Sequence, residues 1–170
     1  MHIHLKHNDI VVDATVGNGN DTLFLAQLVP KGFVFGFDIQ KTAINNTTKL
    51  LEKNNINNYQ LFLENHQNIK EVLKDYIGKI SLINFNLGYL PGGDKSITTN
   101  YKSTIRAIKN SLDLLNNKGI ILITVYPGHE AGLKEKEELE KYLNSLKNYQ
   151  IKYFKNTNNQ KAPFLIMIKK

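Results

Sequence analysis

A glycine-rich turn between a predicted strand and a predicted helix constrains the fold of this chain more than any other feature. Residues 10–12 are apolar and β-branched, as in a buried parallel strand, and residues 23–30 carry apolar side chains at helical spacing until a proline ends the pattern. Between them, Gly17 and Gly19 let the backbone approach a ligand closely, and residues 20–22 favour the start of a helix. We therefore predict a nucleotide-like ligand at this turn, with a purely structural turn as the alternative.

An acidic residue at the end of the second predicted strand narrows the class of ligand. The apolar residues 33–37 lead directly to Asp38. It follows the glycine turn by about 20 residues, the spacing at which a carboxylate binds both hydroxyls of a ribose. The turn and this acid together predict an adenosine-type ligand. A cap on the following helix is the other role open to Asp38.

Strands and helices alternate to the end of the chain. Hydrophobic periodicity predicts helices at 41–54, 67–76, 98–116 and 134–146, and strands at 59–63, 79–85, 120–125, 149–154 and 163–168. The alternating Glu and Lys residues of the last helix are interpreted as a solvated face. Five strand–helix units and a closing antiparallel pair predict an α/β fold of the Rossmann-like class I methyltransferase type. This fold has a seven-stranded, mostly parallel sheet, an antiparallel C-terminal hairpin and helices on both faces.

Length and composition limit the classes of protein further. The 170 residues, 41% of them hydrophobic, predict a single domain over 1–170. The sequence has no cysteine, which excludes disulfides and thiolate metal sites, and it has no apolar run long enough to cross a membrane. We therefore expect a cytoplasmic protein. His2, His4 and His7 are interpreted as a polar terminus rather than a metal site, and no metal is predicted.

The positive charge of the chain suits a polyanionic partner. The formal net charge is +7, and each phosphate that a protein neutralises releases counterions. Nearly all of this charge is lysine, with Arg106 as the only arginine, and the chain is also rich in asparagine and isoleucine. Because an AT-rich genome produces the same bias, charge alone leaves nucleic-acid binding open.

The segment after the fourth predicted strand combines an amide, an aromatic ring and a glycine pair. The Asn86 amide oxygen and the Leu87 carbonyl oxygen can accept hydrogens from a substrate amine, and Tyr89 can stack on a base. Asp94 and His129, on loops at the same sheet edge, are candidates for proton removal or RNA binding. A structural turn and a helix cap are the alternatives for this segment and for His129.

The end of the third predicted strand faces the same crevice. Asn65 and His66 follow it directly, so either side chain could contact an adenine edge. A cap by Asn65 on the following helix is the alternative.

Three motifs together resemble a known family. They are DATVGNGNDT at 13–22, FNLGYLPGGDK at 85–95 and YPGH at 126–129. The chain resembles the rRNA methylase family, whose characterised members are tRNA 5-(aminomethyl)-2-thiouridine methyltransferases, over essentially its whole length. The resemblance implies methyl transfer from S-adenosylmethionine to the aminomethyl nitrogen of the wobble uridine, giving 5-methylaminomethyl-2-thiouridine. The implied partner is the tRNA anticodon arm.

The motifs and the predicted sheet edge assign the site residues. Catalytic roles are predicted for Asn86, Tyr89, Asp94 and His129. Cofactor contacts are predicted for Asp13, Thr15, Gly17, Asn18, Gly19, Asp21, Thr22, Asp38, Gln40, Asn65, His66 and Asn86. A homodimer is expected as a way to widen the basic surface for an anticodon arm. Family members usually carry a helix before the first strand, where this sequence has residues 1–9, so we expect either a shorter wall of the cofactor or tRNA site or a misassigned gene start.

Other functions share some of these features. Methylation of rRNA or of a small-molecule amine would use the same fold and cofactor. An NAD-dependent enzyme is disfavoured by the terminal hairpin and by Thr22, which stands where the dinucleotide fingerprint has a small residue. A non-catalytic RNA-binding module would not need the set formed by Gly17, Gly19 and Asp38.

Overall fold

The structure is a computed structural model that describes residues 4–90, 92, 98–155, 157–159 and 161–170. Strands and helices alternate along it. The elements are β1 (Ile10–Asp13), α1 (Asn20–Leu28), β2 (Phe33–Asp38), α2 (Lys41–Lys53), β3 (Tyr59–Leu63), η1 (His66–Asn68), α3 (Ile69–Val72), η2 (Lys74–Tyr76), β4 (Ile80–Asn86), α4 (Tyr101–Leu114), β5 (Leu115–Val125), α5 (Glu130–Asn144), β6 (Gln150–Phe154) and β7 (Phe164–Lys169), where η marks a 3-10 helix.

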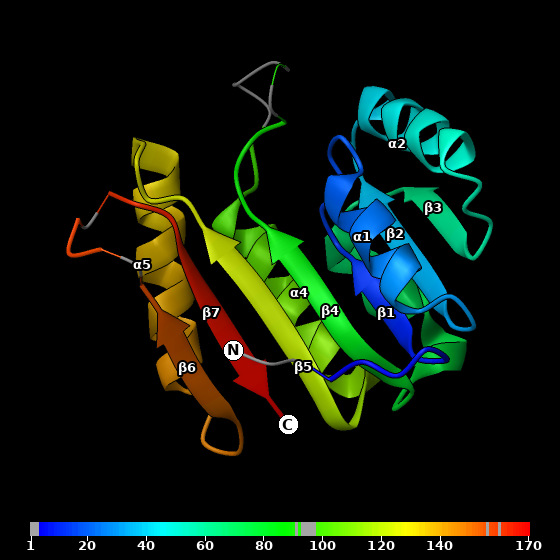
Figure 1. Cartoon of the computed structure of the whole chain (residues 1–170). Coiled ribbons are helices and arrows are strands. Elements are labelled where there is room, and N and C mark those ends of the chain that lie inside the picture. Colours follow the sequence, from blue (N-terminus) through cyan, green and yellow to red (C-terminus); the bar gives the residue numbers. More distant parts are fainter. Residues whose placement is uncertain (1–3, 91, 93–97, 156, 160) are drawn as a thin grey trace.

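One seven-stranded sheet forms the centre of the fold, in the order β3-β2-β1-β4-β5-β7-β6 (Figure 1). The pairs among β1 to β5 are parallel, whereas β7 lies antiparallel between β5 and β6. Helices α1 and α2 contact each other on one face, and α3, α4 and α5 form a connected layer on the other. The predicted mostly parallel sheet with an antiparallel C-terminal hairpin and helices on both faces is confirmed.

The pleat of the strands divides the apolar side chains between two cores. In β1, Val11 packs with Leu25 of α1 in the smaller core, while the next residue, Val12, belongs to the larger core beneath α4 and α5. The same alternation puts Leu82 and Ile83 of β4 on opposite faces. Strands β1 and β4 are thus buried on both sides, as expected for the centre of a parallel sheet.

Several predicted boundaries are wrong. The helix predicted at 67–76 is broken into η1, α3 and η2, because the Asn65 side chain accepts a hydrogen bond from Gln67 N at 2.9 Å and closes a tight first turn. Strand β5 begins at Leu115, where that residue pairs with Ile80, rather than at 120. Helix α5 begins at Glu130, four residues earlier than the pattern predicts.

Candidate active site

A cleft of about 1050 Å³ opens at the carboxyl ends of β1, β2, β4 and β5, where α/β sheets bind ligands. It is lined by the turn after β1, the ends of β2 and β3, the segment after β4, the start of α4 and the loops before α5 and β7. The predicted site residues among its lining are Thr15, Gly17, Asn18, Asp21, Asp38, Gln40, Asn65, His66, Asn86, Tyr89 and His129.

The glycine turn has the backbone conformation that its sequence requires. Gly17 has φ +55° and Gly19 has φ +83°, both in the left-handed region that L side chains rarely adopt. Gly19 is also the N-cap of α1, and no side chain caps this end of the helix. A Cβ atom at Gly19 would lie 2.6 Å from Oγ1 of Thr47, so the turn packs tightly against α2.

Asp38 joins the end of β2 to this turn. Its Oδ2 accepts a hydrogen bond from Gly17 N at 2.9 Å, and its Oδ1 accepts one from Gln40 N at 2.9 Å. The N-cap of α2 is Gln40, which makes no side-chain cap bond. Each carboxylate oxygen keeps a second lone pair, so Asp38 can still accept from a ligand hydroxyl in the cleft.

Three predicted cofactor residues are not among the lining of the cleft: Asp13, Gly19 and Thr22. The Asp13 carboxyl group is fully buried and accepts a hydrogen bond from Thr22 Oγ1 at 2.6 Å. Burial is the main cause that raises the pKa of Asp13 to about 7, and the bond from Thr22 opposes it. The structure therefore gives Asp13 and Thr22 a bracing position beneath the turn.

Asp21 connects the glycine-turn side of the cleft to β4. Its Oδ2 accepts hydrogen bonds from the side-chain amides of Asn84, at 3.2 Å, and Asn86, at 3.3 Å. Thr15 Oγ1 accepts the backbone N–H of Asn86 at 2.6 Å. Because the Asn86 amide nitrogen points to Asp21, its amide oxygen is left as the acceptor for a ligand. The Asp21–Asn84 contact could not be foreseen from sequence spacing.

His66 offers a neutral nitrogen acceptor in the same cleft. Its Nδ1 lies 3.2 Å from the carbonyl oxygen of Ala14, so Nδ1 carries the proton and Nε2 keeps a lone pair. Nε2 is buried and has no hydrogen-bond partner among the described residues. Burial lowers the pKa of His66 to about 4, which keeps the ring uncharged at neutral pH. Asn65 lines the cleft and also caps η1.

The segment after β4 brings one predicted catalytic residue, Tyr89, to the cleft. Leu87, Gly88 and Tyr89 all line it, and the Tyr89 ring centroid lies 6.0 Å from that of His129. Gly88 has φ +129°. Asp94, the remaining predicted catalytic residue, falls outside the described residues.

His129 combines a helix-cap position with a place in the cleft. It is the N-cap of α5, and its Nδ1 accepts the backbone N–H of Gly132 at 3.1 Å. The neutral ring therefore carries its proton on Nε2, which is buried without a hydrogen-bond partner among the described residues. The helix cap considered for His129 is therefore present, and the residue also lines the cleft.

The solvated face predicted for the last helix is wrong at one position. Glu135 of α5 is only 3% exposed, and its carboxylate accepts hydrogen bonds from Thr99 Oγ1 at 2.7 Å and Thr104 Oγ1 at 2.6 Å. Burial raises the pKa of Glu135, and the two hydroxyl donors oppose that shift. Its spacing of four residues from the buried Leu139 was the available signal.

Charge is unevenly distributed along the cleft. Three carboxylates, Asp21, Asp38 and Glu64, lie on the side of the glycine turn and the ends of β2 and β3. Lys161, in the loop before β7, is the one lysine in the lining among the described residues. Neither Glu64 nor Lys161 belongs to a recognisable motif, so neither was predicted from the sequence. The arrangement suits a cationic ligand on one side and an anionic one on the other.

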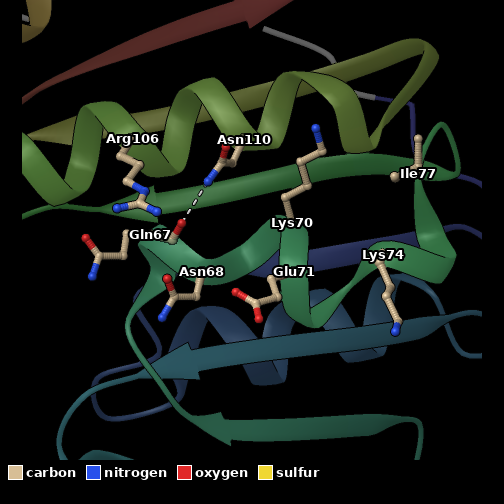
Figure 2. Close-up of a pocket in the computed structure, with 8 residues that line it drawn as sticks. All are labelled: Gln67, Asn68, Lys70, Glu71, Lys74, Ile77, Arg106 and Asn110. Carbon is tan, nitrogen blue, oxygen red and sulfur yellow. Dashed lines mark hydrogen bonds between the residues drawn. The ribbon is translucent and has the colours of Figure 1, made fainter.

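A second cavity of about 350 Å³ lies between α4 and the η1–α3 segment (Figure 2). Asn110 Nδ2 donates to the Gln67 carbonyl oxygen at 2.8 Å and closes one wall. Figure 2 shows the side chains of Lys70 and Lys74 extending in opposite directions, and Lys70 is paired with Asp113 at 2.8 Å. These charges do not converge on one point, so the large cleft is the candidate active site.

Two other kinds of feature are absent from the described residues. No group of three or more His, Cys, Asp or Glu residues in the described part of the chain could hold a metal ion. No helix within the described ranges is long and apolar enough to cross a membrane.

Comparison with known proteins connects the fold and cleft to one family. The chain is 35% identical, over 96% of its length, to the chloroplastic tRNA (mnm(5)s(2)U34)-methyltransferase of Arabidopsis thaliana, and it spans 64% of that protein. It is 42% identical to a "putative rRNA-methylase" from Clostridium thermocellum (TM-score 0.86, covering 95% of this chain and 88% of that one). A "putative methyltransferase" from Streptococcus mutans in complex with SAH (S-adenosylhomocysteine) is 37% identical (TM-score 0.83, covering 95% and 88%).

These likenesses confirm both the predicted Rossmann-like methyltransferase fold and the resemblance found from the motifs. The model of the family described as "Putative rRNA methylase" matches residues 34–169. With most of its length matched in this way, and with solved relatives of the same sheet architecture, the chain belongs to the rRNA methylase family.

Proposed function

We propose that this protein transfers a methyl group from S-adenosylmethionine to the amino nitrogen of 5-aminomethyl-2-thiouridine at the wobble position of tRNA. One observation carries the proposal: the amide oxygen of Asn86 and the carbonyl oxygen of Leu87 lie at one end of β4, beside Tyr89, in the same cleft as the glycine turn. Two acceptors next to an aromatic ring match a base that carries a primary amine. The plant relative is a tRNA methyltransferase of this wobble position by name.

The cofactor is S-adenosylmethionine, and the residues of the cleft fit it. Asp38 has the position and the free lone pairs to bind the ribose hydroxyls, and Asn65 and His66 line the cleft where the adenine edge is predicted. The left-handed turn at Gly17 lets the backbone approach the ligand. The Streptococcus mutans relative was solved in complex with SAH, which supports S-adenosylmethionine as the cofactor.

The chemistry of the transfer is an in-line displacement. When bound, S-adenosylmethionine supplies a sulfonium methyl group: the amine lone pair forms the new N–C bond, and sulfur keeps the electrons of the broken S–C bond. The residues of the chain position the amine, because the leaving group is already activated. Asn86 and the Leu87 carbonyl accept the two amine hydrogens, which directs the nitrogen lone pair toward the methyl group.

A proton must leave the methylated nitrogen, and His129 is not suited to accept it. Its Nδ1 already accepts the backbone N–H of Gly132, and Nε2 carries the ring proton. We therefore assign to His129 a contact through its ring, beside Tyr89, because Nε2 itself is buried. Asp94 stays a prediction for proton removal.

The partner in this proposal is the tRNA anticodon arm. The net charge of +7 and the position of Lys161 at the end of the cleft away from the three carboxylates favour a polyanionic substrate. The homodimer and the cytoplasmic location expected from the sequence stay predictions.

Nucleoside analysis tests the proposal directly. In a strain lacking this gene, mass spectrometry of tRNA nucleosides should show 5-aminomethyl-2-thiouridine accumulating and its methylated form disappearing. Purified protein with labelled S-adenosylmethionine should then methylate that tRNA and leave tRNA from a methylated strain unlabelled. Unchanged wobble nucleosides in the deletion strain would refute the assignment.

Ribosomal RNA is the second candidate substrate, because the matching family is described as an rRNA methylase. The same labelled cofactor, incubated with ribosomal subunits from the deletion strain, separates the two. Label in rRNA and none in tRNA would select this candidate.

A further inference from the structure

Glu135 is a buried carboxylate with a specific set of partners. It lies on α5 outside the lining of the cleft, and both of its oxygens accept hydroxyl hydrogens, from Thr99 and from Thr104. A carboxylate has no hydrogen to give, so it forces both hydroxyl groups to act as donors. Their oxygen lone pairs are then free to accept from other groups.

The Thr99 hydroxyl uses its lone pair on the segment after β4. Gly88 N donates to Thr99 Oγ1 at 2.9 Å, and Thr99 N donates back to the Gly88 carbonyl oxygen at 2.9 Å. A directed chain therefore runs from Gly88 N–H through the Thr99 hydroxyl to Glu135. Thr104 makes the second bond to Glu135 and none to Gly88.

The Gly88 N–H belongs to the same peptide unit as the Leu87 carbonyl group. Among the described residues no peptide bond is cis, so this carbonyl points opposite to the N–H and away from Thr99. Leu87 lines the cleft, and its carbonyl oxygen makes none of the hydrogen bonds found within the described ranges. The hydrogen bond that holds the Gly88 N–H therefore also fixes the direction of the Leu87 carbonyl oxygen.

We propose that Glu135 is a positioning residue that, through the Thr99 hydroxyl, orients the peptide unit of Leu87 and Gly88 so that the Leu87 carbonyl oxygen accepts a hydrogen of the amine being methylated. This inference rests on the proposed function. Hydrogen bonds in a chain polarise one another, and an ionised acceptor strengthens the bond it receives. The buried negative charge therefore also makes the Leu87 oxygen a better acceptor.

Two isosteric substitutions separate this role from a general structural one. Thr99→Val removes the link to Gly88, whereas Thr104→Val removes a hydroxyl bond to the same carboxylate and leaves the link intact. Thr99→Ser keeps the hydroxyl and serves as the conservative rescue. We expect Thr99→Val to lower kcat about tenfold or more, the loss of one oriented hydrogen bond in the transition state. The Kd for S-adenosylhomocysteine should stay within about twofold.

Thr104→Val and Thr99→Ser should keep kcat within about threefold of the wild type, even where Thr104→Val lowers the melting temperature. Wild-type turnover in Thr99→Val would overturn the proposal. Equal losses of kcat in Thr99→Val and Thr104→Val would also overturn it. Such losses would mean that turnover depends on hydrogen bonds to the buried Glu135 in general, and not on the bond from Gly88 N–H to the Thr99 hydroxyl.

A measurement without substrate keeps this test separate from the proposed function. In the free protein, the amide signal of Gly88 should shift and exchange faster with solvent in Thr99→Val and Glu135→Gln, and stay near its wild-type position in Thr104→Val. If the wild type methylates no tRNA while these signals behave as stated, the proposed function fails and the positioning chain stands. An unmoved Gly88 signal in Thr99→Val refutes the chain itself.

Discussion

The backbone N–H of Gly17 donates a hydrogen bond to Oδ2 of Asp38 at 2.9 Å, across 21 residues of sequence. This bond fixes the glycine turn after β1 to the end of β2 before any ligand is present. A preformed turn costs less conformational entropy on binding than a mobile one. Asp38 is therefore expected to act both as a ligand acceptor and as the support of the turn.

Replacing Asp38 should chiefly weaken cofactor binding. Asp38→Ala removes the ribose acceptor and the bond to Gly17 together, so we expect S-adenosylhomocysteine to bind at least about tenfold more weakly in calorimetry. Asp113→Ala is the control, because it removes one exposed acid of the same charge far from the cleft. Equal affinities in wild type and Asp38→Ala would exclude the ribose role.

Asn86 and Asn84 provide a matched test and control for the substrate-binding role of Asn86. Both side-chain amides donate to Asp21, and only Asn86 lines the cleft. Asn86→Ala should lower turnover by about a hundredfold or more, with affinity for S-adenosylhomocysteine within a few fold. Asn84→Ala should keep turnover within a few fold of the wild type. Similar losses in both variants would assign the effect to Asp21 rather than to an acceptor on Asn86.

Two glycines test whether close packing or the left-handed backbone conformation excludes a side chain from the glycine turn. Gly19 and Gly78 have similar positive φ angles, +83° and +72°, but a Cβ atom would meet Thr47 at Gly19 and nothing within 4 Å at Gly78. Gly78→Ala should therefore cost about 1 kcal/mol of folding stability from strain alone. Gly19→Ala should cost more and also weaken cofactor binding, as thermal unfolding and calorimetry can show. A smaller loss in Gly19→Ala than in Gly78→Ala would contradict the close packing.

The buried Asp13 makes stability depend on pH. Its pKa is about 7 in the folded protein, above the ordinary value of 3.8, so the folded state binds more protons than the unfolded state between these values. Its contribution to the free energy of unfolding therefore falls as pH rises from about 4 to about 7. Asp13→Asn should remove this fall, so that the variant gains stability relative to the wild type as the pH rises from 4 to 7 in urea unfolding.

His66 has the opposite effect over nearly the same range. Its folded pKa of about 4 lies below the ordinary 6.5, so the folded state binds fewer protons and its contribution is lost as pH falls from about 6.5 to about 4. His66→Gln should therefore lose stability relative to the wild type as the pH rises through this window. Matching pH slopes in wild type and His66→Gln would contradict a depressed pKa.

Most of the fold could be predicted because its signals are local. The apolar runs of β1, β2 and β4, the helical spacing of α4 and the glycine turn each agree with one architecture. Boundaries failed where a specific contact decides them: Leu115 pairs with Ile80 of β4, and the local cap of His129 on Gly132 N starts α5 early. The hydrophobic periodicity of the sequence gives no information about these contacts.

The site residues were predicted from motifs. A motif does not distinguish residues that contact a ligand from residues that support the loop that holds it. Asp13 and Thr22 belong to the first motif, yet the structure buries them as a hydrogen-bonded pair beneath the turn. Glu135 was assigned to solvent because its neighbours are Lys and Glu, although its partners, Thr99 and Thr104, lie more than 30 residues earlier in the chain. Long-range polar pairs of this kind have no signature in a single sequence.

The double contact of Asp21 has a kinetic consequence. Asp21 lies in the first turn of α1, directly after the glycine turn, and it holds the amide of Asn86 on β4. The amide that receives the amine is therefore oriented from the cofactor side of the cleft. Loss of the Asp21 carboxylate should lower kcat as well as the affinity for the methyl donor, because one side chain joins the two halves of the site.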